Sequence, residues 1–266
     1  MANTIWNSAD KDAALTLSGG NLTVTLGSST TSGIRAVDKQ VTGKFYWECT
    51  ATTWSAISES VGLAPITWAR GTTLTGSVAG LTGLTRGGQI YVDGAAIVSG
   101  FGTIANGSVI CIAFDADSRL VWYRVGSGGN WNNSASANPA TGAGGVQTYL
   151  GRGIPAYPAL GLTTSGSAVT ANFGDSAFVG AVPSGFTAGF TAGASVPTNA
   201  IASQALAEHW LTTNPQAQVT QVVAEHWASV ASGNLQAVVT QVLLEHWTSV
   251  AVVVPAAGGP MVTMIH

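Results

Sequence analysis

Three copies of a Glu-His-Trp triplet are the residues of this chain best suited by type and spacing to do chemistry. The triplets occupy residues 208–210, 225–227 and 245–247. Adjacent residues of a strand point to opposite faces, so the Glu and His of one triplet cannot chelate one ion together. His209, His226 and His246 could converge on a metal if the repeats pair in register, or if three subunits bring one histidine to an axis. We favour a packing role, in which each Trp is an apolar anchor and no metal is bound.

No other constellation of side chains indicates catalysis. The chain has no Gly-x-Ser-x-Gly nucleophile motif, and every histidine except His266 lies in the triplets. Asp115 and Asp117 could suggest calcium binding or glycosidase chemistry, but they lie at the tip of a predicted hairpin, where Asp is a common turn residue. We therefore predict a protein that is not an enzyme and that needs no cofactor.

Several tryptophans are candidates for ligand binding. Trp47 and Trp122 lie inside predicted strands and are expected in the core. Trp54, Trp68 and Trp131 lie near loops rich in Gly, Ser and Thr. An exposed aromatic side chain on a sandwich loop can stack on a sugar or anchor a protein partner. We therefore predict that these last three residues belong to ligand-binding loops.

The composition argues against two classes of partner. Only 8% of the 266 residues are charged, against about 25% in an average soluble domain, and the net charge is -3. No cluster of Lys or Arg occurs, so we do not expect nucleic-acid binding. The apolar run at 250–257 is shorter than the roughly 20 residues that a membrane-spanning helix needs, so we expect no membrane insertion.

The N-terminal residues contain no recognisable export signal. We therefore expect synthesis in the cytoplasm. The neutral, hydroxyl-rich composition is nevertheless typical of proteins that work outside a cell or in a particle. A particle component that is made in the cytoplasm and released by lysis would meet both expectations. Cys49 and Cys111 both lie in apolar strand-like runs, where buried free thiols are expected, although a disulfide between them stays open.

The region from Trp6 to about Phe186 alternates short β-branched or aromatic runs with turn residues. Predicted hairpins include 15–26, with its turn at 18–21, and 108–125, with its turn at 115–118. A strand at 90–92 is followed by the turn residues Asp93 and Gly94. This spacing predicts an all-β antiparallel sandwich over residues 1–187.

A different pattern begins near Gly185. Residues 188–200 are rich in Gly, Ala, Thr and Pro and predict a linker. Residues 201–266, here called the C-terminal tail, contain Gln-x-x-x-Glu-His-Trp at 204–210, 221–227 and 241–247. As helices, the repeats would have an apolar stripe at spacings of three and four residues. We favour strands, because Val219 to Val223 and Val238 to Val242 are dense in β-branched residues.

The predicted sandwich resembles the SPRY (B30.2-like) family, in particular its bacteriophage versions. The resemblance rests on ordered motifs over about 180 residues. These are Trp6-Asn7 with Asp10-Lys11, Gly43-Lys44-Phe45-Tyr46-Trp47-Glu48, Val61-Gly62-Leu63-Ala64, the hairpin 108–123, Tyr157-Pro158-Ala159-Leu160 and Asn172-Phe173-Gly174. Cys111 and Ile112 depart from the pattern, since a small Gly is common there. The resemblance implies a jelly-roll-like sandwich that recognises proteins, and the tail repeats resemble segments of phage virion proteins.

These observations predict a structural and binding protein of a tailed bacteriophage virion, a fibre, spike, collar or decoration protein. The tail would add its strands to copies of itself, as a homo-oligomer with a trimer first, or to other virion proteins. The predicted assembly residues are Trp210, Trp227, Trp247, Val219, Val223, Val239 and Leu243. The alternatives are a carbohydrate-binding adhesin of the host surface and, with no residue set to support it, an envelope hydrolase.

Overall fold

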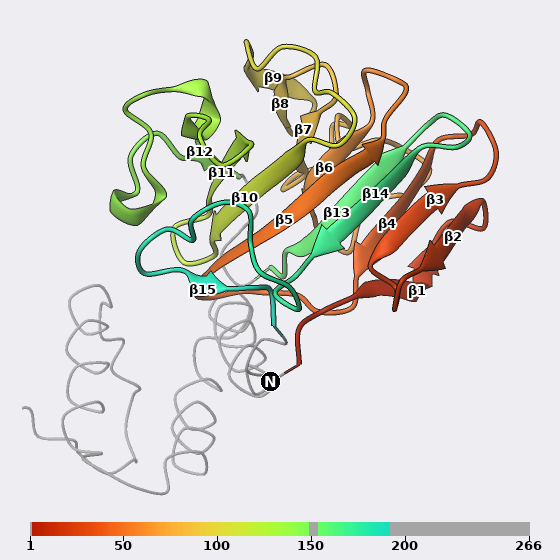
Figure 1. Ribbon diagram of the computed structural model, residues 1–266, viewed down its shortest axis with the longest axis horizontal. Helices are drawn as coiled ribbons and strands as arrows, with labels where there is room; N and C mark the ends of the chain where they lie inside the picture. The colour runs from red at the N-terminus through yellow and green to blue at the C-terminus, as the bar shows by residue number, and fades with distance from the viewer. Residues whose placement is uncertain (1, 149–153, 192–266) are drawn as a thin grey trace, which may run out of the picture. The chain divides into compact units, whose positions relative to one another are not determined.

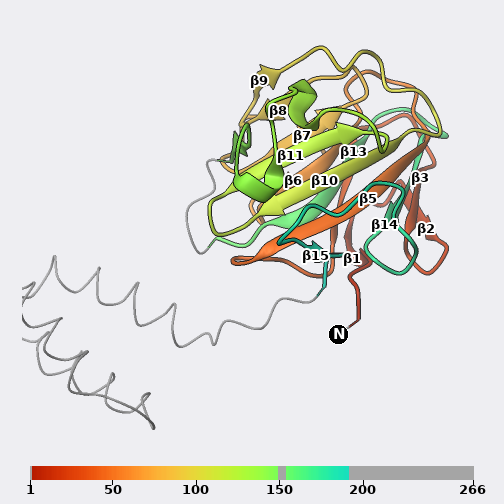
Figure 2. The ribbon, with the colours of Figure 1, turned by 60° about the vertical axis from the view of Figure 1, so that its left-hand side comes forward.

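The structure of the protein is a computed structural model that describes residues 2–148 and 154–191, and these residues form two β-sheets packed face to face (Figures 1 and 2). The only helical segments of the described chain are short 3-10 turns at Trp131–Asn133 and Pro139–Thr141. The predicted all-β antiparallel sandwich is therefore confirmed. The predicted assembly residues and the three triplet histidines all lie outside the described residues.

The first sheet, here called the β13 sheet, has the strand order β1-β4-β13-β6-β7-β8-β9. Its strands are β1 (Trp6–Lys11), β4 (Ser32–Ala36), β13 (Tyr157–Leu162), β6 (Ser60–Ala64), β7 (Thr82–Thr85), β8 (Ile90–Val92) and β9 (Ala95–Val98). All neighbours in this sheet are antiparallel. β1 and β9 form the two edges of this sheet.

The second sheet, here called the β5 sheet, has the order β12-β11-β10-β5-β14-β3-β2, with β15 pairing with β5 in parallel. Its strands are β12 (Val146–Gln147), β11 (Leu120–Val125), β10 (Val109–Asp115), β5 (Lys44–Thr53), β14 (Ala168–Asn172), β3 (Thr23–Leu26), β2 (Leu15–Ser18) and β15 (Thr187–Ala188). The ten-residue β5 lies near its centre.

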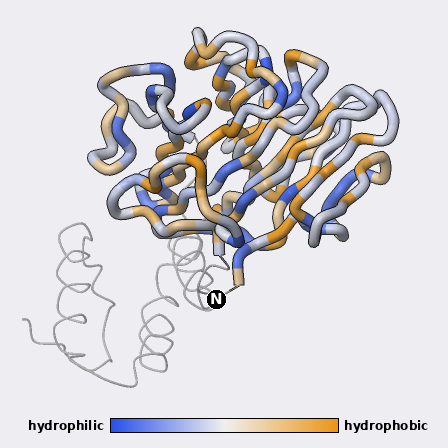
Figure 3. Tube along the Cα trace, in the orientation of Figure 1, coloured by the Kyte–Doolittle hydropathy of each residue, from blue (hydrophilic) through white to orange (hydrophobic). Residues whose placement is uncertain are grey.

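The main core fills the space between the sheets. Alternation along β5 sends Phe45, Trp47 and Cys49 into this core, while Tyr46 lies in a second cluster on the outer face. Hydrophobic positions recur along the strands of both sheets (Figure 3). Trp122 also belongs to the outer cluster and is fully buried, so Trp47 and Trp122 are both buried, as predicted.

The predicted hairpins form as expected. β2 and β3 pair around a turn in which Gly19 and Gly20 have φ angles of 58° and 67°, a left-handed conformation that Gly adopts without strain. β8 and β9 join through Asp93 and Gly94, both also at positive φ. The pattern of alternating apolar residues with turn residues was therefore sufficient to predict these local pairings.

The carboxylates Asp115 and Asp117 shape the β10–β11 turn. Asp115 accepts hydrogen bonds from the backbone N–H groups of Asp117 and Ser118, both at 3.0 Å, and its other oxygen lies 3.2 Å from Nζ of Lys44. Asp117 accepts from the backbone N–H of Gly43 at 3.0 Å. Both carboxylates thus have the turn-forming role expected of Asp.

The two cysteines are buried, free thiols. They lie on adjacent strands, where Cys49 is opposite Ile110 and Cys111 is opposite Glu48. Cys49 faces the main core and Cys111 faces the outer cluster. Because their side chains leave opposite faces of one sheet, the disulfide that the sequence left open does not form.

The sandwich extends beyond the boundary predicted at 187. Thr187 and Ala188 pair with Phe45 and Tyr46, and Thr191 bridges to Asn3. The Phe190 side chain is fully buried, with its ring centroid 5.2 Å from those of Phe45 and Trp47. Residues 188–191 are therefore part of the fold and not of the predicted linker, because Phe190 completes the aromatic packing around β5.

Candidate binding surface

Two of the three predicted loop tryptophans are buried, so their predicted exposure is wrong. Trp54 is 1% exposed and belongs to the main core. Trp68 is 2% exposed and packs with Leu74 and Leu81 on the outer face of the β13 sheet. Trp54 packs in the core between the sheets, and the loop of Trp68 covers the outer face of the β13 sheet. Gly, Ser and Thr around a tryptophan therefore did not indicate an exposed ring.

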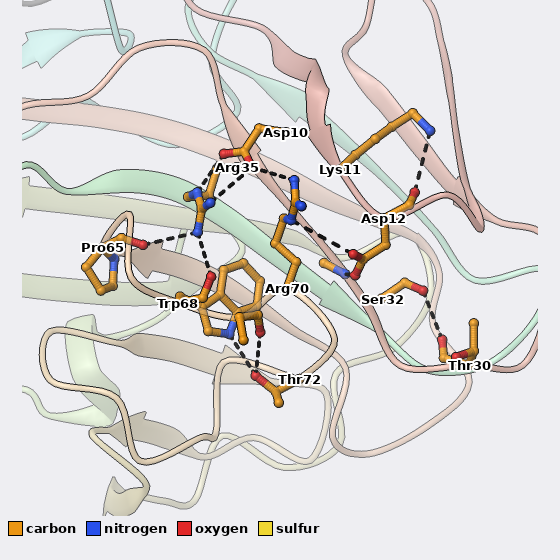
Figure 4. A network of polar contacts seen from close by, with 12 residues as sticks. Asp10, Lys11, Asp12, Thr30, Ser32, Arg35, Pro65, Trp68, Arg70 and Thr72 are labelled. Atoms are coloured by element: carbon orange, nitrogen blue, oxygen red, sulfur yellow. Dashed lines mark hydrogen bonds and ion pairs between the residues drawn. The ribbon is translucent and has the colours of Figure 1, made fainter.

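Gly33 and Arg35, two residues apart on one face of β4, explain the burial of Trp68. A β-carbon on Gly33 would lie 2.4 Å from the Trp68 ring, so the absence of a side chain lets the indole rest on the strand. Arg35 donates hydrogen bonds to the carbonyl oxygens of Pro65 and Trp68, at 3.2 and 2.9 Å. The loop that carries Trp68 is thereby fixed to the sheet (Figure 4).

An ion-pair network holds Arg35 in place. Its Nε lies 2.7 Å from Oδ2 of Asp10, and the other oxygen of Asp10 pairs with Arg70 (Figure 4). Arg70 also lies 3.9 Å from Asp12. Asp10 is thus shared by two guanidinium groups that come from β4 and from the covering loop. We assign this network a structural role, because its ion pairs connect β1, β4 and the loop that covers them.

Trp131 is the predicted loop tryptophan that stays partly exposed. The guanidinium carbon of Arg124 lies 4.3 Å from the centroid of its ring, within the range of a cation–π contact. Tyr46 meets the ring edge-on at a centroid distance of 6.4 Å. One part of the indole is therefore engaged within the protein, and the remainder is available to a ligand.

A buried carboxylate lies close to this aromatic group. Glu48 is 2% exposed. One of its oxygens accepts from the Tyr46 hydroxyl at 2.6 Å and from the N–H of Gly180 at 2.7 Å, and the other accepts from the N–H of Val179 at 3.0 Å. Cys111 Sγ lies 3.7 Å from the same carboxylate. Glu48 therefore fastens the loop around residue 180 to the outer face of the β5 sheet.

This group of Glu48, Tyr46 and Cys111 contains the residue types of a nucleophilic site, but its electrostatics oppose that role. Burial is the largest effect and raises the pKa of both the Cys111 thiol and the Tyr46 hydroxyl. A thiolate is the nucleophilic form of cysteine, so a raised pKa makes the sulfur unreactive at neutral pH. The arrangement suits a structural fastening and not covalent chemistry.

A second buried carboxylate organises one end of the sandwich. Glu59 is 0% exposed. One oxygen accepts from the N–H groups of Ser55 and Ala56 at 2.9 and 3.2 Å, and the other accepts from those of Thr163 and Thr164 at 3.2 and 3.0 Å. Four backbone donors thus compensate for the burial of the charge. The β5–β6 loop and the β13–β14 loop are held together at this point.

The loop that Glu59 holds presents an exposed isoleucine beside a small hollow. Ile57 is 69% exposed, and its carbonyl oxygen accepts from the N–H of Gly87 at 2.9 Å. The hollow has a volume of about 170 Å³, and none of the described residues that line it is charged. Its lining includes Ile57, Ser58, Thr75, Thr85, Gln89 and Tyr91. An apolar rim with hydroxyl and amide groups can bind one uncharged side chain of a partner.

Sequence reasoning missed both Glu59 and the hollow. Glu59 stands between two serines in a loop-like segment, and such a carboxylate is ordinarily on the surface. The four hydrogen bonds that bury it come partly from residues about a hundred positions later in the chain. Ile57 gave no indication either, because a single exposed apolar residue is common on protein surfaces.

The structure leaves the metal prediction for the triplets untested. Across residues 2–148 and 154–191, no group of three or more His, Cys, Asp or Glu side chains could hold a metal ion. The three candidate histidines lie outside this part of the chain. No helix in the same part is long and apolar enough to cross a membrane.

No family model and no curated protein matches the chain. Solved structures with a similar fold include three SPRY domains. The SPRY domain of human HERC1 is 14% identical with a TM-score of 0.49, covering 62% of this chain and 96% of that one. The TRIM65 PSpry domain is 13% identical with a TM-score of 0.48, covering 64% of this chain and 92% of that one. A human SPRY domain is 14% identical with a TM-score of 0.42, covering 62% of this chain and 98% of that one.

Proposed function

We propose that this protein is a non-enzymatic structural and binding component of a tailed bacteriophage virion. The sandwich would be displayed on the particle, and the tail would serve assembly. The observation that carries the proposal is the threefold repeat, which follows a sandwich whose sheets and core the described residues already supply. The scarcity of charge, 8% of residues, supports a role outside a cell.

The assembly mechanism we propose is β-augmentation, the addition of a strand to an unpaired sheet edge. The predicted strands at 203–211, 218–230 and 237–252 would pair with copies of themselves or with another virion protein. Trp210, Trp227 and Trp247 would fill apolar pockets of the partner. Because each chain carries the same repeats, a symmetric homo-oligomer is favoured, with a trimer as the first expectation.

The binding role of the sandwich is supported by its preformed loops. Buried Glu48 and Glu59 fix two loops through backbone hydrogen bonds, and the second of these loops presents Ile57. A surface that is ordered before binding loses little conformational entropy when it binds. We therefore propose a protein partner for the loop end around the hollow.

The alternative, a carbohydrate-binding adhesin, is less well supported than it was by sequence alone. A cluster of exposed Trp54, Trp68 and Trp131 would have favoured it, and the first two are buried. Of these three tryptophans, Trp131 remains partly exposed. A single aromatic platform can still stack on one sugar, so direct glycan-binding measurements on a Trp131→Ala variant would test what is left of this alternative.

Truncation after Thr198 tests the main proposal. The truncated chain contains every described residue of the sandwich. We expect it to be folded by circular dichroism, monomeric by sedimentation velocity and absent from assembled particles, whereas the full chain is oligomeric and is incorporated. A truncated form that still oligomerises and is incorporated would contradict the assembly role of the tail.

A further inference from the structure

An arginine without an acidic partner lies on the outer face of the β5 sheet. Arg124 of β11 is 8% exposed, and it forms no ion pair with any of the described residues. It lies opposite Cys111 on β10, which in turn lies opposite Glu48 on β5. The oxygens of Glu48 accept from one hydroxyl and two backbone N–H groups instead. Burying a positive charge is costly unless the charge is paired, so Arg124 calls for an explanation.

The contacts of Arg124 leave one of its N–H groups at the surface. Nη2 donates to the carbonyl oxygen of Ala181 at 3.4 Å, a long hydrogen bond. The Cys111 thiol, a weak acceptor, also interacts with the guanidinium. Nε is enclosed and has no hydrogen-bond partner among the described residues, whereas Nη1 is not enclosed and forms no hydrogen bond within them. A donor of this nearly buried cation is therefore open to a ligand.

Trp131 stands next to this cation in a fixed position. Its ring centroid lies 4.3 Å from the guanidinium carbon of Arg124. The next residue, Asn132, is buried, accepts from the N–H of Tyr123 at 2.8 Å and donates to two carbonyl oxygens at 3.2 and 2.8 Å. Its φ angle of 46° is one that a residue other than Gly keeps only where the surroundings hold it. The partly exposed indole is thus ordered before any ligand binds.

The two neighbouring groups together indicate the chemistry of the ligand. A neutral sugar would stack on Trp131 but would leave the Arg124 charge unpaired. An acidic side chain of a protein would pair with Arg124, but it has no ring to place against the indole. A sugar that carries a carboxylate uses both groups. The exposed side chain of Asn130, beside Trp131, adds an uncharged donor and acceptor for the sugar hydroxyls.

We propose that Trp131 and Arg124 form a binding site for one acidic sugar residue, of the uronic-acid type, in a polysaccharide. The sugar ring stacks on the exposed part of the indole, and the sugar carboxylate accepts a hydrogen bond from Nη1 of Arg124. This inference rests on the glycan-binding alternative given above, whose ligand class it specifies, and it does not depend on assembly through the tail. Arg124 is then the residue that selects a charged sugar over a neutral one.

A matched pair of sugars tests the role of the charge in the full-length, unsubstituted chain. Methyl glucuronide and methyl glucoside have the same ring and differ in a carboxylate against a hydroxymethyl group. Titrations are followed by NMR through the indole N–H signal of Trp131, which is identified by its absence in Trp131→Phe. We expect a saturable shift with the glucuronide and roughly tenfold weaker binding of the glucoside, because a hydrogen bond to a charged group contributes at least that much. Added salt should weaken glucuronide binding.

Two substitutions and a control separate the contributions of the two side chains. Arg124→Gln should remove the preference for the glucuronide, and Trp131→Ala should remove the binding of both sugars, as saturation-transfer NMR on the sugar signals would show. Lys39→Gln is the matched control, because the Lys39 ammonium also lies over an aromatic ring, 5.8 Å from the centroid of Tyr157, and should bind as the unsubstituted chain does. If Arg124→Gln is unfolded by circular dichroism, the sugar pair still decides in the unsubstituted chain.

The outcomes distinguish this inference from the functions proposed above. Equal affinity for the two sugars would overturn it, while Trp131 would remain a candidate for a neutral glycan. If acetate or a capped Gly-Glu-Gly peptide shifts the Trp131 signal as strongly as the glucuronide does, the site takes an acidic protein side chain and the inference is also overturned. No shift with either sugar would remove both this inference and the glycan-binding alternative. None of these results bears on assembly through the tail, which the truncation after Thr198 tests.

Discussion

Replacement of Glu59 by glutamine would test the structural account at its most specific point. The substitution keeps the size of the side chain and removes its charge. Each oxygen of Glu59 accepts two backbone N–H groups, from Ser55 and Ala56 on one side and from Thr163 and Thr164 on the other. Neither orientation of a Gln amide avoids a clash, because its NH₂ group must face two N–H donors.

The expected loss follows from these contacts. A hydrogen bond to a charged group contributes about 1.5–3 kcal/mol, and two such bonds are lost in either amide orientation. Removing a buried charge offsets part of this loss, so we expect the free energy of unfolding to fall by about 3 kcal/mol. For a domain of this size that corresponds to a Tm lower by roughly 6–12 °C.

Denaturant unfolding and amide hydrogen exchange would measure the effect. The four backbone N–H groups that donate hydrogen bonds to Glu59 should lose protection from exchange. A general loss of packing would not lower the protection of these four groups selectively. Glu48→Gln is the matched comparison, because its amide can place NH₂ toward Val179 and keep the oxygen toward Tyr46 and Gly180. We expect about half the destabilisation there. Unchanged stability and unchanged exchange in Glu59→Gln would refute the reasoning.

Three further predictions follow from burial and charge. Gly62→Ala should destabilise the fold by about 3 kcal/mol, because a β-carbon there would lie 2.1 Å from a backbone oxygen of β7; an unchanged urea midpoint would disprove this. Cys49 and Cys111, whose pKa values are raised by burial, should resist alkylation at pH 8 in the native protein and react in guanidinium; labelling of the native form would contradict the structure. Burial alone would raise the pKa of Asp115, but the hydrogen bond from the N–H of Ser118 and the nearby Lys44 ammonium hold this pKa below the ordinary value for Asp. The stabilisation is present above the ordinary pKa of Asp and is lost as the pH falls through the lowered pKa. Lys44→Met should therefore be less stable than the unsubstituted chain at pH 7, and the difference should shrink in strongly acidic solution, as pH-dependent unfolding would show.

The sequence predicted those parts of the fold that depend on neighbouring residues. The β2–β3 and β10–β11 hairpins have alternating apolar residues on either side of a turn, and both appear in the structure. The division of β5 into a core face and an outer face follows from the same alternation. Local chain geometry determines such features, so one segment of sequence is enough to predict them.

Features that depend on distant residues were not predictable in this way. Trp68 lies against Gly33, and nothing in the sequence around either residue indicates the other. Phe190 stands in a duplicated Gly-Phe-Thr-Ala segment that suits a linker, yet it is buried between Phe45 and Trp47. Glu59 needed the β13–β14 loop to bury it. In each case a contact across the fold outweighed the local composition.

The meeting of residues 3–4 with residues 190–191 has a practical consequence. The N–H of Thr4 donates to the carbonyl of Phe190 at 2.8 Å, and Asn3 bridges to Thr191. A folded unit whose two ends lie side by side can be inserted into a surface loop of an unrelated host protein without distorting either fold. Joining these ends by a short bridge and opening the chain at another turn should likewise yield a circularly permuted variant with the same two sheets.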